Sequence, residues 1–157
     1  MKKNLSIREL GFIVTTFPFR KVLTENPEFF HKEDVRLVDE VKKYFDGYGI
    51  DSGLNPLITG SILKGSRDYN DIDIVVYPKR EESQIDYHSL WDYSNAARTL
   101  ESCARGKTKI NEWEVDILGM MPKSYDYGGV NVEYRFRIKS PHSRTSVDVT
   151  FGEPISK

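Results

Sequence analysis

Hydrophobic and polar residues alternate in several short runs of the chain. The clearest run is Val132–Lys139, in which every second residue is apolar and the residues between are charged. Successive side chains of a strand point to opposite faces of a sheet, so this run predicts a strand with one buried face and one polar face. The same alternation predicts strands over Trp113–Ile117 and Ser146–Phe151.

Two further apolar runs also predict strands. Leu57–Thr59 follows the turn Asn55-Pro56, and Asp71–Tyr77 contains a nearly continuous apolar stretch before Pro78. Short apolar runs bounded by turn residues are typical of strands inside a sheet. We therefore expect the second run to be a central strand.

Apolar residues at helical spacing predict three helices. The first opens at Ser6, where Ser6-Ile7-Arg8-Glu9 has the pattern of a capping box. The second covers Val35–Tyr48 and is closed by glycines, and the third covers Ile85–Cys103.

The order of these elements predicts an α+β fold, with a mixed, mostly antiparallel sheet and helices packed on one face. The chain has 157 residues, the size of one domain. We expect a single domain over 1–157, with an N-terminal helical part (1–54) followed by the sheet (55–157).

Composition narrows the class of protein. A hydrophobic content of 38% predicts a folded globule, and a net charge of −1 argues against strong non-specific binding of nucleic acid. Cys103 is the single cysteine, which excludes an intrachain disulfide and a cysteine-based zinc site.

Membrane association is not expected from the sequence. No apolar run is long enough to span a bilayer. The start, Met1–Leu5, is not followed by the apolar core of a signal peptide. We expect a cytoplasmic protein that does not contact a membrane.

The segment Gly60–Asp73 carries the candidate chemistry. The small-residue turn Gly60-Ser61 follows one predicted strand, and Asp71 and Asp73 open the next. Backbone N–H groups of such a turn suit phosphate oxygens. Two carboxylates at alternate strand positions share a face, where they repel each other and attract a cation. Mg²⁺ prefers oxygen ligands and is usually shared with phosphates, so the segment predicts phosphoryl or nucleotidyl transfer.

Other phosphate and metal motifs fit this segment less well. Gly65 is followed by Ser66, where a Walker A loop requires lysine. An EF-hand loop beginning at Asp68 would place Asp73 where that loop requires glycine. A solvated pair of aspartates at a strand end is the remaining alternative.

Gly60-Ser61, Gly65-Ser66 and Asp71-Ile72-Asp73 resemble the signature of the DNA polymerase beta-like nucleotidyltransferases, which is an apolar strand, Gly-Ser, a spacer and Asp-x-Asp with an apolar middle residue. The resemblance implies that Asp71 and Asp73 are catalytic metal ligands. It also implies a nucleotide-binding segment made of Gly60, Ser61, Lys64, Gly65, Ser66 and Arg67. Lys64 and Arg67 either add positive charge for the phosphates or are simply solvated.

The family adds a third carboxylate on a later strand, and two residues fit. Asp148 is preferred, because apolar residues bracket it and its segment resembles the last hairpin of the abortive-infection type nucleotidyltransferase toxins. Asp116 stays open as the alternative, since its separation from Asp73 is more usual in the family, and Glu114 would share its face.

Arg135, Arg137 and Lys139 are expected to share the polar face with Asp148 if their strands pair. They form either an ordinary charged strand face or a basic wall that holds a triphosphate or the phosphates of an acceptor.

The resemblance implies a magnesium-dependent enzyme that transfers an NMP from an NTP to a hydroxyl of an acceptor and releases pyrophosphate. Two Mg²⁺ or Mn²⁺ ions would be held by Asp71, Asp73 and Asp148. The acceptor is RNA or tRNA, a protein or a small molecule. The alternative is an inactive module of the same fold that binds nucleotide or a partner protein, such as an antitoxin or a defence-system component. Only Gly152–Lys157 follow the hairpin of Asp148, which favours a small toxin–antitoxin or phage-defence enzyme.

Overall fold

The computed structural model describes residues 5–6, 15–48, 54, 56–81, 84–127 and 130–154. Its strands are Leu5–Ser6 (β1), Thr15–Pro18 (β2), Leu57–Thr59 (β3), Asp71–Val76 (β4), Arg80–Glu81 (β5), Gln84–Ile85 (β6), Glu114–Tyr127 (β7), Val130–Lys139 (β8) and Ser146–Pro154 (β9). Seven of them form one sheet in the order β1-β2-β3-β4-β9-β8-β7, and β5 and β6 form a separate hairpin. Within the sheet β4 and β9 run parallel, and the other described neighbours run antiparallel.

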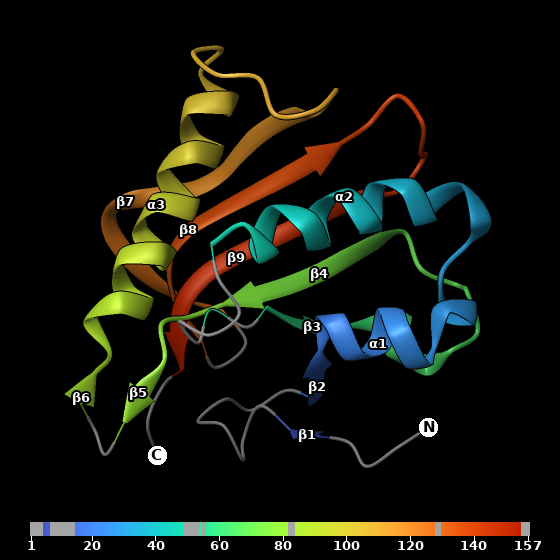
Figure 1. Ribbon diagram of the computed structural model, residues 1–157, viewed down its shortest axis with the longest axis horizontal. Coiled ribbons are helices and arrows are strands. Elements are labelled where there is room, and N and C mark those ends of the chain that lie inside the picture. Colours follow the sequence, from blue (N-terminus) through green and yellow to red (C-terminus); the bar gives the residue numbers. More distant parts are fainter. Residues whose placement is uncertain are drawn as a thin grey trace.

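The helices are Phe19–Glu25 (α1), Val35–Asp46 (α2) and Tyr87–Ala104 (α3), with short 3-10 turns at Pro27–Phe29 (η1), Lys32–Asp34 (η2) and Ser61–Lys64 (η3). All three helices lie on the same side of the sheet, with α2 in front of β4 and β9 (Figure 1). The predicted α+β fold, with a mostly antiparallel mixed sheet and helices on one face, is therefore confirmed.

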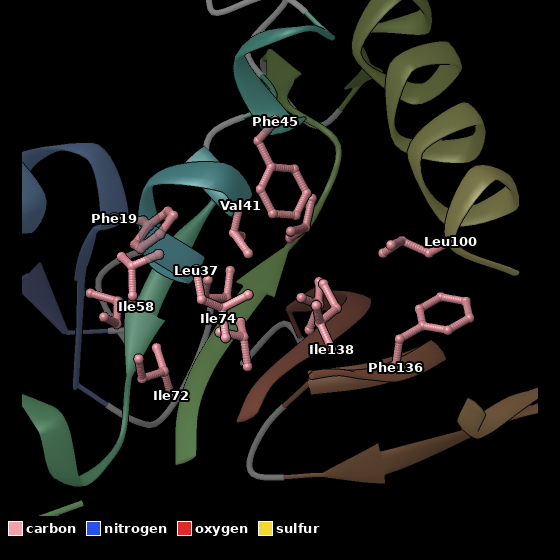
Figure 2. Packing of buried hydrophobic residues seen from close by; sticks show 14 of the residues in the cluster. Phe19, Leu37, Val41, Phe45, Ile58, Ile72, Ile74, Leu100, Phe136 and Ile138 are labelled. Atoms are coloured by element: carbon pink, nitrogen blue, oxygen red, sulfur yellow. The ribbon is translucent and has the colours of Figure 1, made fainter. Parts of the chain in front are cut away.

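The core forms between the helices and alternate residues of the central strands. Ile72 and Ile74 of β4 are fully buried, and Figure 2 shows Leu37, Val41 and Phe45 of α2 packed over this strand. Burying each such side chain contributes about 1.5–3 kcal/mol to folding. Asp71, Asp73, Arg135, Arg137 and Asp148 point to the opposite face, which carries no helix. Glu133 of β8 lies at a register shift and accepts a hydrogen bond from Tyr93 of α3 instead.

Most predicted elements are found at their expected places. The second and third predicted helices are α2 and α3, and the predicted strands are β3, β4, β7, β8 and β9. β7 extends to Tyr127, well beyond the predicted end at Ile117.

The N-terminal part differs from the prediction. Leu5–Ser6 pairs with Thr15–Thr16 as strand β1, which was not predicted. The predicted helix that Ser6 would cap lies outside the described residues. β2 and α1 have no counterpart in the prediction, and Pro18 directly precedes the first turn of α1. The sheet therefore extends into residues 1–54.

None of the helices in the described part of the chain has both the length and the apolar character needed to cross a membrane.

A buried aspartate joins α2 to the loops that lead into β4 and β9. Asp34 is fully buried, directly before α2. Its carboxylate accepts hydrogen bonds from the hydroxyls of Tyr69 at 2.6 Å, Ser143 at 2.5 Å and Thr145 at 3.0 Å. Tyr69 precedes β4, and the other two residues lie between β8 and β9. One carboxylate thus fixes the two loops that enter the parallel strand pair.

We predict that Asp34→Ala lowers the free energy of unfolding by about 2–4 kcal/mol, because three hydroxyls lose a charged acceptor inside the protein. Urea denaturation measures the change. Asp39→Ala is the matched control, because Asp39 is an exposed partner of Lys43 on the same helix and such pairs contribute about 0.5 kcal/mol or less. Equal losses in the two variants would contradict the role given to Asp34.

Candidate metal centre

Three carboxylates meet on the helix-free face of the sheet, near the beginning of β4 and β9. Carboxylate oxygens of Asp71, Asp73 and Asp148 lie within 4.8 Å of one another. Asp73 and Asp148 are direct partners in the parallel β4–β9 pair, and Asp71 is the partner of Ser146. Because alternate residues of a strand share a face, this register alone places all three carboxylates together.

The structure includes Asp148, and not Asp116, in this cluster. Asp116 of β7 is the register partner of Arg137 of β8, which in turn is the partner of Asp148. Two strand spacings separate the backbones of the two aspartates, which is about 10 Å. The carboxylate of Asp116 instead forms an ion pair with Lys139 at 3.6 Å. The preference for Asp148 as the third carboxylate agrees with this geometry, and the alternative Asp116 does not.

Two arginines of β8 neutralise part of the negative charge. Arg137 donates to both oxygens of Asp148, at 2.8 and 3.0 Å, and lies 4.0 Å from Asp71. Arg135 lies 3.8 Å from Asp148. The hydrogen bonds to Asp148, and then its charge, raise the pKa of Arg137 above its ordinary value. Asp148 is only 1% exposed, so these cations offset a buried charge that would otherwise be costly.

Burial and repulsion act together on the carboxyl of Asp73. Burial, followed by the charges of Asp71 and Asp148, raises the pKa of Asp73 to about 6, although Arg135 and Arg137 act in the opposite direction. A divalent cation would relieve this repulsion. Three carboxylates are the oxygen donors that Mg²⁺ and Mn²⁺ prefer, so the donor set fits such an ion.

The turn after β3 approaches the cluster more closely than a side chain would permit. Gly60 has a φ of +90°, and a Cβ built on it would lie 2.8 Å from Oδ2 of Asp73. Ser61 follows immediately and begins η3. The structure thus brings the predicted Gly60-Ser61 turn against the predicted metal ligands, and glycine is required for this contact.

The rest of the predicted nucleotide-binding segment turns toward η1. A Cβ on Gly65 would lie 3.0 Å from the ring of Phe29, and Nε of Arg67 donates to the carbonyl oxygen of Glu28 at 2.7 Å. The side chains of Lys64 and Ser66 are exposed. Gly65 and Arg67 therefore connect the loop to η1, in addition to any contact with a ligand.

A cavity of about 500 Å³ adjoins the cluster and was not predicted. Residues of β7, β8, the β8–β9 loop and the start of β9 line it, among them Glu114, Arg137, Lys139, Ser140, Arg144 and Ser146. The signal for it in the sequence is the segment Ser140–Ser146, which concentrates hydroxyl groups and a positive charge between two strands.

Comparison of the chain with protein-family models, with curated proteins and with solved structures gives no match. The function of the chain is therefore inferred from the residues of the site.

We predict that Gly60→Ala distorts the cluster, because the new methyl group collides with the carboxylate of Asp73 in addition to straining the backbone. The expected loss of stability is about 2–4 kcal/mol, with weaker binding of Mn²⁺ followed by calorimetry. Gly106→Ala is the control, since Gly106 has a φ of +75° but no atom within 4 Å of its Cβ position. A Gly60→Ala protein that binds Mn²⁺ as the control does would refute the close contact.

The raised pKa of Asp73 predicts a pH dependence of stability in metal-free buffer. A carboxyl whose pKa is higher in the folded state stabilises the fold at low pH, and this contribution is lost as the pH rises through about 6. Asp73→Asn removes the titrating group. As the pH rises from 4.5 to 7.5, the free energy of unfolding of the variant should therefore increase relative to that of the native chain, by on the order of 2 kcal/mol.

Thermal unfolding at the two pH values measures this gain, with Asp116→Asn as the control outside the cluster. Excess Mg²⁺ should cancel the difference at pH 7.5 by stabilising the native chain. A gain that is the same at both pH values would show that Asp73 ionises normally.

Proposed function

We propose that the chain is a metal-dependent nucleotidyltransferase that transfers an NMP from an NTP to a hydroxyl of an acceptor and releases pyrophosphate. The observation that carries this proposal is the group of Asp71, Asp73 and Asp148 within 4.8 Å, with the Gly60-Ser61 turn against Asp73. The resemblance of these residues to the DNA polymerase beta-like signature supports the same reaction.

In this proposal, Asp71, Asp73 and Asp148 hold Mg²⁺ or Mn²⁺. When bound, the metal supplies positive charge for the leaving pyrophosphate and makes the attacking hydroxyl more acidic. The acceptor oxygen attacks the α-phosphorus, the bond to the pyrophosphate oxygen breaks, and the hydroxyl proton passes to a carboxylate of the cluster. The protein contributes mainly position and charge.

Neighbouring residues have distinct roles in the proposed site. In this proposal the Gly60-Ser61 turn binds the triphosphate, because the absence of a Cβ on Gly60 lets the turn lie directly against Asp73. Arg137 orients Asp148 through its two hydrogen bonds, as partners of metal ligands commonly do. An NTP substrate also implies that the protein acts in the cytoplasm.

A module that binds nucleotide or a partner protein without turnover is the second candidate. It is favoured by the bidentate pair between Arg137 and Asp148, which neutralises a buried carboxylate without any metal. Turnover separates the two candidates, since both would bind nucleotide.

We predict that the purified chain releases pyrophosphate from one of the four NTPs in the presence of Mg²⁺ or Mn²⁺, with total RNA or cell extract added as a source of acceptor. Asp73→Asn should reduce the rate at least about 100-fold, because charge stabilisation is the main catalytic contribution. Asp116→Asn is the matched control: it makes the same chemical change on the same face of the sheet, outside the cluster, and should keep the native rate.

Equal rates in the native chain and in Asp73→Asn would refute the assignment of the cluster. NTP binding without pyrophosphate release under every condition would favour the binding module.

A further inference from the structure

We infer that the cavity beside the three carboxylates is the acceptor subsite, and that it takes a phosphate-bearing ribonucleoside, either a free nucleotide or the end of an RNA strand. This inference rests on the proposed function for its direction of transfer. The position of the cavity, the residues that line it and the rigidity of its wall support this ligand class.

The position of the cavity suits an acceptor. Arg137 lines the cavity and also binds Asp148, while Ser146 lines it and is the register partner of Asp71. The Gly60-Ser61 turn approaches the cluster from β3, on the other side of β4. The carboxylates therefore lie between the turn and the cavity, so that groups bound at these two places meet at the cluster.

The lining of the cavity combines two kinds of polar group. Lys139, Arg144 and the hydroxyls of Ser140 and Ser146 suit a phosphate. Glu114 can accept hydrogen bonds from donors such as ribose hydroxyls or the amino group of a base, whereas Glu112 already pairs with His142 at 3.0 Å and Arg36 at 3.5 Å.

A nucleotide carries both kinds of group in one small molecule. An inorganic anion would leave Glu114 without a donor from the ligand, and several consecutive phosphates would be repelled by the charge of the two glutamates. The volume of about 500 Å³ falls in the range of small-molecule sites. One nucleotide unit is therefore the ligand that matches the size and the charges of the cavity.

The wall of the cavity is held in place before any ligand binds. Ser143 and Thr145 donate their hydroxyl hydrogens to the buried Asp34. The backbone N–H of His142 donates to Oγ of Ser140 at 3.2 Å, and the N–H of Thr145 donates to Oγ of Ser143 at 3.1 Å. A loop fixed in this way loses little conformational freedom on binding, which favours affinity.

Binding in metal-free buffer containing EDTA tests the subsite without turnover. The probes are AMP, adenosine and a 5′-phosphorylated RNA trinucleotide, each titrated by calorimetry into the native chain, Arg144→Gln and Lys139→Gln. We expect the native chain to bind AMP or the trinucleotide at least about 10-fold more tightly than adenosine, and each variant to lose about 10-fold, because a charge-assisted hydrogen bond to phosphate is removed.

Arg98→Gln and Lys107→Gln are the controls, since both residues are exposed and neither lines the cavity. They should bind the probes as the native chain does.

The outcomes identify the ligand or reject the subsite. Binding of AMP points to a free nucleotide, and binding of the trinucleotide alone points to an RNA end. Native affinity in Arg144→Gln and Lys139→Gln, equal affinity for adenosine and AMP, or no binding of any probe would overturn the inference.

The same variants separate this inference from the proposed function. If pyrophosphate release depends on Asp73 but probe binding does not depend on Arg144, the subsite is refuted and the transferase is supported. Probe binding that needs Arg144, without pyrophosphate release under any condition, would keep the nucleotide site and reject the transferase.

Discussion

The parallel pairing of β4 with β9 is the interaction on which the site depends. Its register places Asp73 beside Asp148 and Asp71 beside Ser146. A slip of one residue would turn Asp148 toward the helices and bring Val147 or Val149 to the polar face. Burial prevents this slip, because both valines are fully buried in the core under the helices. The hydrophobic core therefore decides where the carboxylates meet, although it contains none of them.

Electrostatic repulsion destabilises the fold where β4 and β9 bring the carboxylates together. Three carboxylates in a small volume repel one another, and this repulsion adds to burial in raising the pKa of Asp73. Arg135 and Arg137 reduce it, but they pair chiefly with Asp148, which is the most buried of the three. Clusters of carboxylates that repel one another are common at functional sites, because any site that binds a cation carries unbalanced negative charge when the cation is absent. The long β8–β9 and β7–β8 pairings supply the rigidity that keeps the charges together.

Local patterns in the sequence predicted the buried and polar faces of most strand residues and the positions of two helices. Alternation over Val132–Lys139 predicted Phe136 and Ile138 as core residues of β8, but a register shift near Val132 brings Glu133 to Tyr93 of α3. The Asp71-Ile72-Asp73 pattern predicted two carboxylates on one face. Strand order was not predictable, because the neighbour of β4 is chosen by packing between distant segments, and this choice alone separates Asp148 from Asp116. Asp34 could not be identified either, since its partners are Tyr69, Ser143 and Thr145, far away in the chain.

The cavity and the cluster share the β8–β9 hairpin, yet they can change independently. Asp148 and its partner Arg137 lie within paired strands, where register and burial restrict substitution. Arg144 lies in the connecting loop and is exposed, so its side chain can change without disturbing the sheet. The loop itself is fixed through the side chains of Ser143 and Thr145 on Asp34, and Arg144 lies between these two residues. In the proposed site, the reaction could therefore stay constant while the ligand of the cavity changes, because the three carboxylates and the loop residues that line the cavity have separate structural constraints.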